Sequence, residues 1–292
     1  MEFLRDHPCS VCATKTKLAC PGCRSAGLEI LFCGAQHQKL IWPLHKQVCG
    51  ARAKPFQPPP LSADESTEIA TLVRLNIKVP RTGQPLGKDV ENAFVGMSGP
   101  VQDGTLQLLQ TPQPEHQLRP EHTVASILTT LRADAYSAKL KLNKKTEPAS
   151  MPEWWIVATL ELAARKLLPP APPSDGARAQ DDPRLDSFRH QALVFATLLR
   201  RRYLCRLPGA APSSTAAVVP DAYILRALET ALDALNGVAD FTGADSAESV
   251  GRLMDVVSDT LGSAASVEFE VAGLMTPPLD AIRVRAQNAK WK

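Results

Sequence analysis

The chain has 292 residues, and its 33 Lys and Arg residues nearly balance its 30 Asp and Glu residues, which gives a formal net charge of +3. Hydrophobic residues make up 44% of the chain, as in globular proteins, yet no apolar run approaches the roughly 20 residues of a membrane-spanning helix. Length and composition therefore exclude a transmembrane protein and leave room for one or two globular domains besides any small motif.

Six of the seven cysteines and two of the six histidines form four regularly spaced pairs near the N-terminus. A C-x2-C turn directs two thiolates at one metal ion, and side chains four residues apart lie on one face of a helix with Cβ atoms about 5–6 Å apart. Eight such ligands fit two closed tetrahedral zinc sites, each with three Cys and one His, and closed sites are structural rather than catalytic. The predicted ligands are Cys9, Cys12, Cys20, Cys23, Cys33, His37, His45 and Cys49.

A disulfide framework is the alternative for so many cysteines in one short segment. The first ten residues are charged and lack the apolar core of a secretory signal, and the paired Cys and His spacing exceeds what a disulfide scaffold needs. We therefore predict reduced thiols and an intracellular protein of the nucleus or cytoplasm. The remaining Cys205 is predicted to be a small buried apolar residue.

The segment from residue 32 to 49 resembles the second half of a MYND-type zinc finger. It contains an aromatic-Cys pair, a ligand followed by an amide at His37 and Gln38, and the run Trp-Pro-Leu-His-Lys-Gln-Val-Cys that starts at Trp42. A HIT-type finger also has paired cysteines, but the seven-residue gap that contains Trp-Pro favours the MYND type. The resemblance covers about residues 9–49. The MYND family usually has Cys at the position of His37, and imidazole is an equally competent zinc ligand.

The resemblance implies interleaved metal sites, in which alternate ligand pairs share one ion. One zinc would be held by Cys9, Cys12, Cys33 and His37, and the other by Cys20, Cys23, His45 and Cys49. About forty residues bury too little surface to be stable alone, whereas structural zinc contributes on the order of 10–16 kcal/mol in small fingers. We therefore expect a small cross-braced finger whose fold depends on two zinc ions.

The resemblance also implies that the finger binds short proline-containing peptides, with Gln38 and Trp42 as the contacting residues. Because Pro43 cannot continue a helix from the preceding turn, we expect it to start a second short helix. Trp42 would then lie either beneath the helix junction as a packing residue or at a surface groove as a binding anchor. Both interpretations of Trp42 remain open on the sequence.

Proline-rich stretches divide the chain beyond the predicted finger of residues 1–54. Residues 55–61 contain four prolines and are predicted to be a semi-rigid linker, or else a ligand for another domain. Residues 62–114 contain one helix and an irregular segment, and residues 115–292 form a helical domain with a loop or disordered insertion at 169–182. The predicted fold class is a small cross-braced zinc-binding finger followed by an all-α domain.

Hydrophobic periodicity and capping residues predict the helices of the second part. Ser62 and Glu65 form a capping-box pattern that opens the first of them. Adjacent Trp154 and Trp155 cannot face one direction on a helix, so one is expected in the core, and the other is a candidate contact residue with core packing as the default. The further predicted helices span residues 123–142, 153–168, 184–204, 221–235, 245–262 and 276–291. His116, His122 and His190 have no companions at ligand spacing and are interpreted as ordinary polar residues.

The predicted function is that of a protein–protein interaction adaptor or regulator without enzymatic activity. Only eight residues precede Cys9, too few for the catalytic segment that precedes the finger in SET-domain methyltransferases, and the sequence has no P-loop, G-x-S-x-G or H-E-x-x-H motif. Residues 1–54 carry a formal +5, which six thiolates and two zinc ions lower to about +3, so direct nucleic-acid contact is not expected. The alternatives are an enzyme with an unrecognised helical catalytic domain and a nucleic-acid-associated transcriptional regulator.

Overall fold

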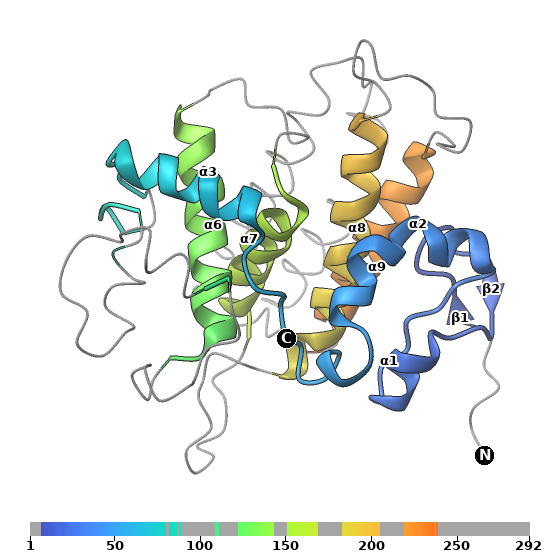
Figure 1. Cartoon of the computed structure of the whole chain (residues 1–292). Helices are drawn as coiled ribbons and strands as arrows, with labels where there is room; N and C mark the ends of the chain where they lie inside the picture. The colour runs from blue at the N-terminus through green and yellow to red at the C-terminus, as the bar shows by residue number, and fades with distance from the viewer. Residues whose placement is uncertain are drawn as a thin grey trace, which may run out of the picture.

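The computed structural model describes residues 7–79, 82–86, 88, 109–110, 122–142, 151–168, 183–204, 219–236 and 238. These residues form a small finger with two short strands, followed by a mainly helical region (Figure 1). The predicted fold class is therefore confirmed. Within the described residues, no helix has both the length and the apolar character that a membrane crossing requires.

The finger is built from one hairpin and a few short helices around a minimal apolar core. Strands β1 (His7–Pro8) and β2 (Lys15–Thr16) pair antiparallel with His7 opposite Thr16. The helices are α1 (Pro21–Ser25) and α2 (Ala35–His45), followed by the 3-10 turns η1 (Lys46–Val48) and η2 (Gly50–Arg52). Besides the cysteines, the buried apolar side chains of this region are Val11, Leu28, Ile30, Leu31, Phe32, Ile41, Val48 and Ala53. Eight such side chains are a small core, which leaves much of the stabilisation to other interactions.

Helix α2 runs through Pro43 without interruption, so the predicted second helix that starts at this proline was wrong. Proline removes one backbone donor, and here the missing N–H would have bonded to the carbonyl oxygen of Lys39, four residues earlier. Both residues lie on the exposed side of the helix, where water can satisfy that oxygen. The proline also lies near the C-terminal end of α2, where few further backbone hydrogen bonds depend on it. There the Gln47 side-chain amide donates to the carbonyl oxygen of Pro43 over 3.2 Å.

The second part of the chain contains five long helices among the described residues. Helix α3 (Ala63–Arg74) starts with the predicted capping box: the Glu65 amide donates to Ser62 Oγ over 3.1 Å, and the Ser62 amide donates to Glu65 Oε2 over 3.0 Å. The other helices are α6 (Val124–Leu142), α7 (Glu153–Arg165), α8 (Asp186–Leu204), which follows the 3-10 turn η5 (Pro183–Leu185), and α9 (Asp221–Asn236). The predicted helices at these positions are confirmed. The predictions for residues 169–182, 245–262, 276–291, His116 and Cys205 lie outside the described residues.

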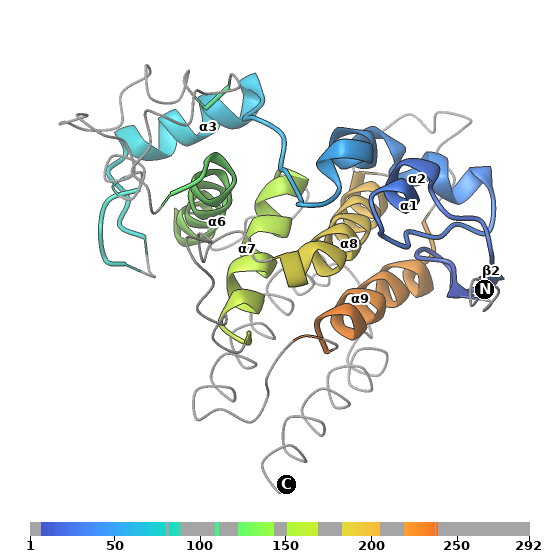
Figure 2. The same ribbon diagram turned by 90° about the horizontal axis from the view of Figure 1, so that it is seen from below.

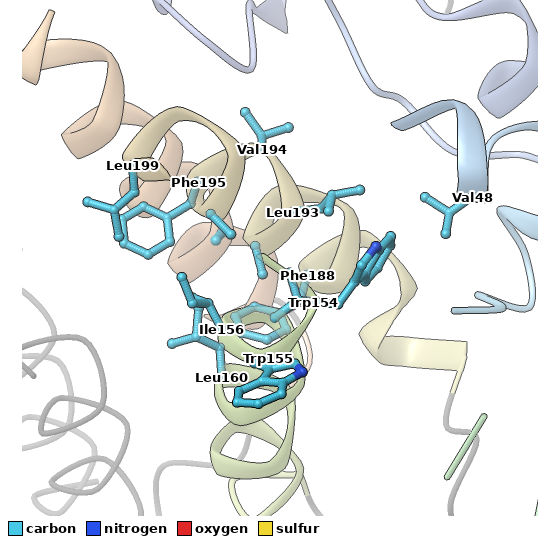
Figure 3. Close-up of a cluster of buried hydrophobic side chains, with 14 of the residues drawn as sticks. Val48, Trp154, Trp155, Ile156, Leu160, Phe188, Leu193, Val194, Phe195 and Leu199 are labelled. Carbon is cyan, nitrogen blue, oxygen red and sulfur yellow. The ribbon is translucent and has the colours of Figure 1, made fainter. Parts of the chain in front are cut away.

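The helices pack as a row, with the finger at one end and α3 at the other (Figure 2). Helix α8 lies in the middle of this row and packs against α7, α9 and α2 of the finger. Because neighbours cover it on several sides, its residues from Phe188 to Leu199 are all buried. Figure 3 shows Phe188 and Phe195 of α8 in the same apolar cluster as Trp155 of α7. Helix α8 therefore provides a well-packed surface that α2 of the finger contacts.

Both adjacent tryptophans of α7 are buried, so neither marks an outer contact surface. Trp155 lies in the core with α8, whereas Trp154 faces the segment after the finger, where its ring centroid is 6.3 Å from that of Phe56. The Arg132 guanidinium lies 5.6 Å above the Trp154 ring. Two residues about 100° apart on one helix can both be buried here, because α7 has neighbours in both directions.

The proline-rich segment of residues 55–61 is packed against the helices. Phe56, Pro59 and Leu61 are buried, and the Phe56 amide donates to Asp186 Oδ1 at the start of α8 over 3.1 Å. The Leu61 amide donates to the carbonyl oxygen of Leu109 over 3.0 Å. These contacts fix the path of the chain from the finger to α3.

Buried ion pairs join successive helices of the row. Glu161 of α7 accepts from Arg189 of α8 over 2.8 Å, and Arg189 also donates to Asp186 over 2.8 Å. The Arg132 guanidinium of α6 forms a bidentate pair with Glu65 of α3, at 2.8 and 3.1 Å. Desolvated charges are tolerated only when they are paired, so these contacts specify which helix faces lie together.

Replacement of Arg189 by Leu should strongly destabilise the helical row. The change removes the cation that pairs with both Glu161 and Asp186. The negative charge of these buried carboxylates is then less well balanced, which costs on the order of 3 kcal/mol or more. Urea unfolding followed by far-UV circular dichroism measures this loss. The matched control is Arg226→Leu, because the Arg226–Glu229 pair on α9 is partly exposed, with side chains 27% and 40% accessible, and should contribute less than about 1 kcal/mol. Equal losses in the two variants would contradict this description of the core.

Candidate metal centre

The first Cys/His cluster joins the hairpin to the N-terminal turn of α2. Cys9 and Cys12 lie on the turn between β1 and β2, and Cys33 and His37 lie just before and within the first turn of α2. Cys12 Sγ is 3.5 Å from Cys33 Sγ, and His37 Nδ1 is 3.1 Å from Cys33 Sγ and 3.6 Å from Cys9 Sγ. The four ligand atoms all lie within 4.8 Å of one another.

The second cluster joins α1 to the C-terminal end of α2. Cys20 and Cys23 lie at the start of and within α1, His45 ends α2, and Cys49 follows η1. His45 Nε2 is 3.3 Å from Cys20 Sγ and 3.5 Å from Cys23 Sγ, and Cys49 Sγ is 3.4 Å from Cys20 Sγ and 4.0 Å from Cys23 Sγ. This cluster is mostly buried, whereas the first is half-buried.

The distances between ligand atoms fit tetrahedral zinc. Zn–S bonds of about 2.3 Å and Zn–N bonds of about 2.0–2.1 Å place two sulfurs of a tetrahedron about 3.7 Å apart, and a sulfur and a nitrogen about 3.5 Å apart. The observed Sγ–Sγ distances of 3.4–4.0 Å and Sγ–N distances of 3.1–3.6 Å lie around these values. Disulfide bonds would need sulfurs about 2.05 Å apart, so they are excluded for these six cysteines. Each of the two Cys3His sites can hold one zinc ion.

The order of the ligands along the chain and this crossed geometry identify the motif. The family model of the MYND finger matches residues 9–49. This segment is a MYND finger. The Rho GTPase-activating protein gacZ of Dictyostelium discoideum is 42% identical to this chain over 44 residues, which are 15% of this chain and 4% of gacZ. The chain therefore aligns with only a small fraction of that relative. No solved structure matches the chain.

The ligand at residue 37, where MYND fingers usually have Cys, approaches the site through Nδ1, whereas His45 uses Nε2. Nδ1 is the ring nitrogen nearer the backbone. It can therefore take the place of a short Cys side chain with little displacement of α2. The use of Nδ1 therefore explains how His37 reaches the other ligands of the first site, at 3.1 Å from Cys33 Sγ and 3.6 Å from Cys9 Sγ.

Burial controls the ionisation of the ligands. It raises the pKa of the Cys23 thiol well above its ordinary value, and the neighbouring thiolates of the same site raise it further. Burial also raises the pKa of Cys33 to about 12, with a further contribution from the adjacent Cys12, and it lowers the pKa of His45 to about 4. A neutral imidazole is the form that binds zinc. Clustered thiolates are unfavourable on their own and need a nearby divalent cation to offset their charge.

The α1 turn requires a glycine at position 22, which the sequence analysis missed. A Cβ atom on Gly22 would lie 2.6 Å from Cys49 Sγ and 3.2 Å from the backbone nitrogen of Gly50. The Cys20-Pro-Gly-Cys23 turn thus makes room for a ligand that comes from the far end of the finger. The Pro-Gly pair inside a C-x2-C spacing was the signal for this close approach.

The two imidazole ligands also contact the helical row. The His37 ring packs edge-on against Tyr223 of α9, with ring centroids 5.1 Å apart. The His45 ring lies 6.0 Å from the ring of His190 on α8, and the buried His190 Nε2–H donates to the carbonyl oxygen of Ala53 over 3.2 Å. Both zinc sites are therefore linked to the α8–α9 pair. His190 and Tyr223 lie far from the finger in sequence, so no local spacing could have predicted these contacts.

The two predicted peptide-contacting residues lie one turn apart on α2. Gln38 is half-buried, and Trp42 is 43% exposed. The adjacent face of α2 carries the buried Ile41 and His45 and packs toward α8, and the Trp42 ring centroid lies 6.0 Å from that of His45. Of the two positions open for Trp42, the structure therefore places it at the surface.

Gly22→Ala should weaken zinc binding at the second site. The added methyl group collides with the Cys49 sulfur and with backbone that has little freedom to move. We expect native mass spectrometry to show a population that retains one zinc ion per chain. Gly34→Ala is the matched control, because nothing lies within 4 Å of its added Cβ and its φ of −179° suits any residue. Two tightly held ions in the Gly22→Ala variant would contradict the geometry of this site.

Removal of the metal ions should loosen α8 and α9 as well as the finger, because both imidazole ligands contact these helices. Hydrogen exchange followed by mass spectrometry, with and without a chelator, measures the change. We expect faster exchange in residues 9–53 and in α8 and α9, with a smaller effect in α6, which packs mainly against α7 and α3. Changes confined to the finger would show that it is not coupled to the helices.

Proposed function

We propose that the protein is an interaction adaptor or regulator whose MYND finger binds a short proline-containing peptide of a partner protein. MYND fingers are protein–protein interaction modules, and the finger here spans residues 9–49. The observation that carries the proposal is the exposure of Trp42 on a helix that two zinc sites and α8 hold in place. An aromatic ring on a rigid helix costs little entropy when it binds, which makes it an effective anchor.

The chemistry of α2 suits a proline-containing ligand. An exposed indole offers a flat apolar surface for a proline ring, the mode by which aromatic side chains bind extended proline-rich segments. Gln38 lies four residues before Trp42, hence on the same side of the helix. Its side-chain amide carries both donors and an acceptor, so it can hydrogen-bond the backbone of an extended peptide.

The ligand is proposed to come from another protein, and the proline-rich segment of residues 55–61 is not a candidate because it is already packed within the molecule. Pro59 and Leu61 are buried, and Phe56 packs between Trp154 and His190. Release of this segment would expose an apolar surface of the helical row. It is therefore a poor candidate for the peptide that Trp42 would bind.

The role is proposed to be binding rather than catalysis. Each Cys3His cluster supplies four protein ligands and leaves no open position for a substrate or an activated water. The similarity to gacZ is confined to 44 residues, so the activity in that protein's name is not carried over to this chain. We also propose an intracellular location, in the nucleus or cytoplasm, because reduced thiols are what the metal sites require.

Trp42→Ala should weaken peptide capture while the zinc content stays at two ions per chain. The test is selection of a displayed library of peptides with a fixed central proline against the full zinc-loaded chain, followed by affinity measurement on the recovered peptides. Loss of a binding anchor should raise Kd by about tenfold or more. Leu18→Ala is the matched control, because Leu18 is an apolar residue of the finger that is 60% exposed and lies outside α2. Failure to recover any peptide, or equal effects of the two substitutions, would contradict the proposal.

A further inference from the structure

The finger carries an excess of exposed positive charge. Between residues 7 and 54 it has seven basic side chains and one acidic side chain, Glu29, and all seven basic residues are exposed. Six thiolates and two zinc ions would together contribute −2, which leaves about +4 on this small segment. The basic residues are Lys15, Lys17, Arg24, Lys39, Lys46, Arg52 and Lys54.

Two of these lysines lie on either side of the exposed tryptophan. Lys39 precedes Trp42 by three residues and Lys46 follows it by four, so all three occupy neighbouring positions on the exposed side of α2 and its continuation into η1. The two lysines are seven residues apart, which corresponds to about 10 Å along a helix. We refer to Lys39, Trp42 and Lys46 as the α2 outer face.

Several cations of the helical row form ion pairs within the molecule, whereas the two lysines of the α2 outer face form none with the described residues. The internal pairs are Arg132 with Glu65, Lys139 with Glu68, Arg165 and Arg189 with Glu161, and Arg200 with Glu153. In the part of the chain that the structure describes, neither Lys39 nor Lys46 makes an ion pair or a side-chain hydrogen bond. A rigid helix with an exposed indole between two uncompensated ammonium groups is complementary to an acidic ligand.

We propose that the α2 outer face binds an acidic peptide segment, in which Asp or Glu residues flank the proline or apolar residue that packs on Trp42. This inference rests on the proposed function and specifies the chemistry of its ligand. An extended chain advances about 3.3 Å per residue, so acidic residues about three positions apart span the distance between the two ammonium groups. The isolated charges, separated by an apolar ring, suit such a peptide better than the continuous phosphates of a nucleic acid, which require a basic stripe.

The test uses the full zinc-loaded chain and proline-containing peptides synthesised in two matched forms, with Glu or with Gln on each side of the central proline. We expect the Glu form to bind about fivefold more tightly in low salt, as for two exposed ion pairs, and to lose most of this advantage in high salt. The double variant Lys39→Glu/Lys46→Glu should abolish the preference. The matched control is Lys15→Glu/Arg24→Glu, which changes the net charge equally at exposed positions outside α2 and should retain it.

Each other outcome overturns the inference in a recognisable way. Peptides that bind with no preference for Glu would refute the acidic ligand but leave the proposed function intact, whereas no binding of either form would refute both. Equal loss of preference in the two double variants would assign it to net charge rather than to the α2 outer face. A single-stranded oligonucleotide that binds more tightly than the Glu peptides, with a steep salt dependence removed by Lys39→Glu/Lys46→Glu, would identify nucleic acid as the ligand.

Discussion

The interleaving of four ligand pairs over two metal sites is the constraint on which the finger depends. Each site combines one C-x2-C pair from the first half of the segment with one Cys/His pair from the second half. An ion in either site therefore closes a long loop, and the two loops cross. The apolar core of the finger is too small to fix this arrangement alone. The metal–ligand bonds must supply most of the stabilisation, on the order of 10–16 kcal/mol in small structural zinc sites.

The same constraint positions the finger on the rest of the chain. The two imidazole ligands are the points at which α9 and α8 approach the sites, through Tyr223 and His190. Gln191 of α8 also donates to Ser10 Oγ over 3.4 Å, and the proline-rich segment after the finger is packed against the same helix. One face of α2 is thereby covered, and the other is presented to solvent with Trp42 on it. The helical row thus acts as a platform that fixes the orientation of the binding surface.

The sequence was most informative where short-range spacing determines the structure. The ligand pairs, the Ser62 capping box and most helix positions follow from patterns within a few residues. The contacts of His190 and Tyr223 depend on the packing of segments more than a hundred residues apart. His190 could therefore only be interpreted as an ordinary polar residue, and no local pattern pointed to Tyr223. The helix break expected at Pro43 was wrong because proline's local preference was applied without its surroundings. Lys39 and Pro43 are exposed, so water can bond to the carbonyl oxygen that loses its partner, and the helix continues.

X-ray absorption spectroscopy at the zinc edge, combined with metal analysis of the full chain, tests the central claim most directly. The account predicts two zinc ions per chain, with an average first shell of three sulfurs at about 2.3 Å and one nitrogen at about 2.0–2.1 Å. A single ion per chain would contradict it. So would an average shell of four sulfurs, or one of two sulfurs and two nitrogen or oxygen atoms.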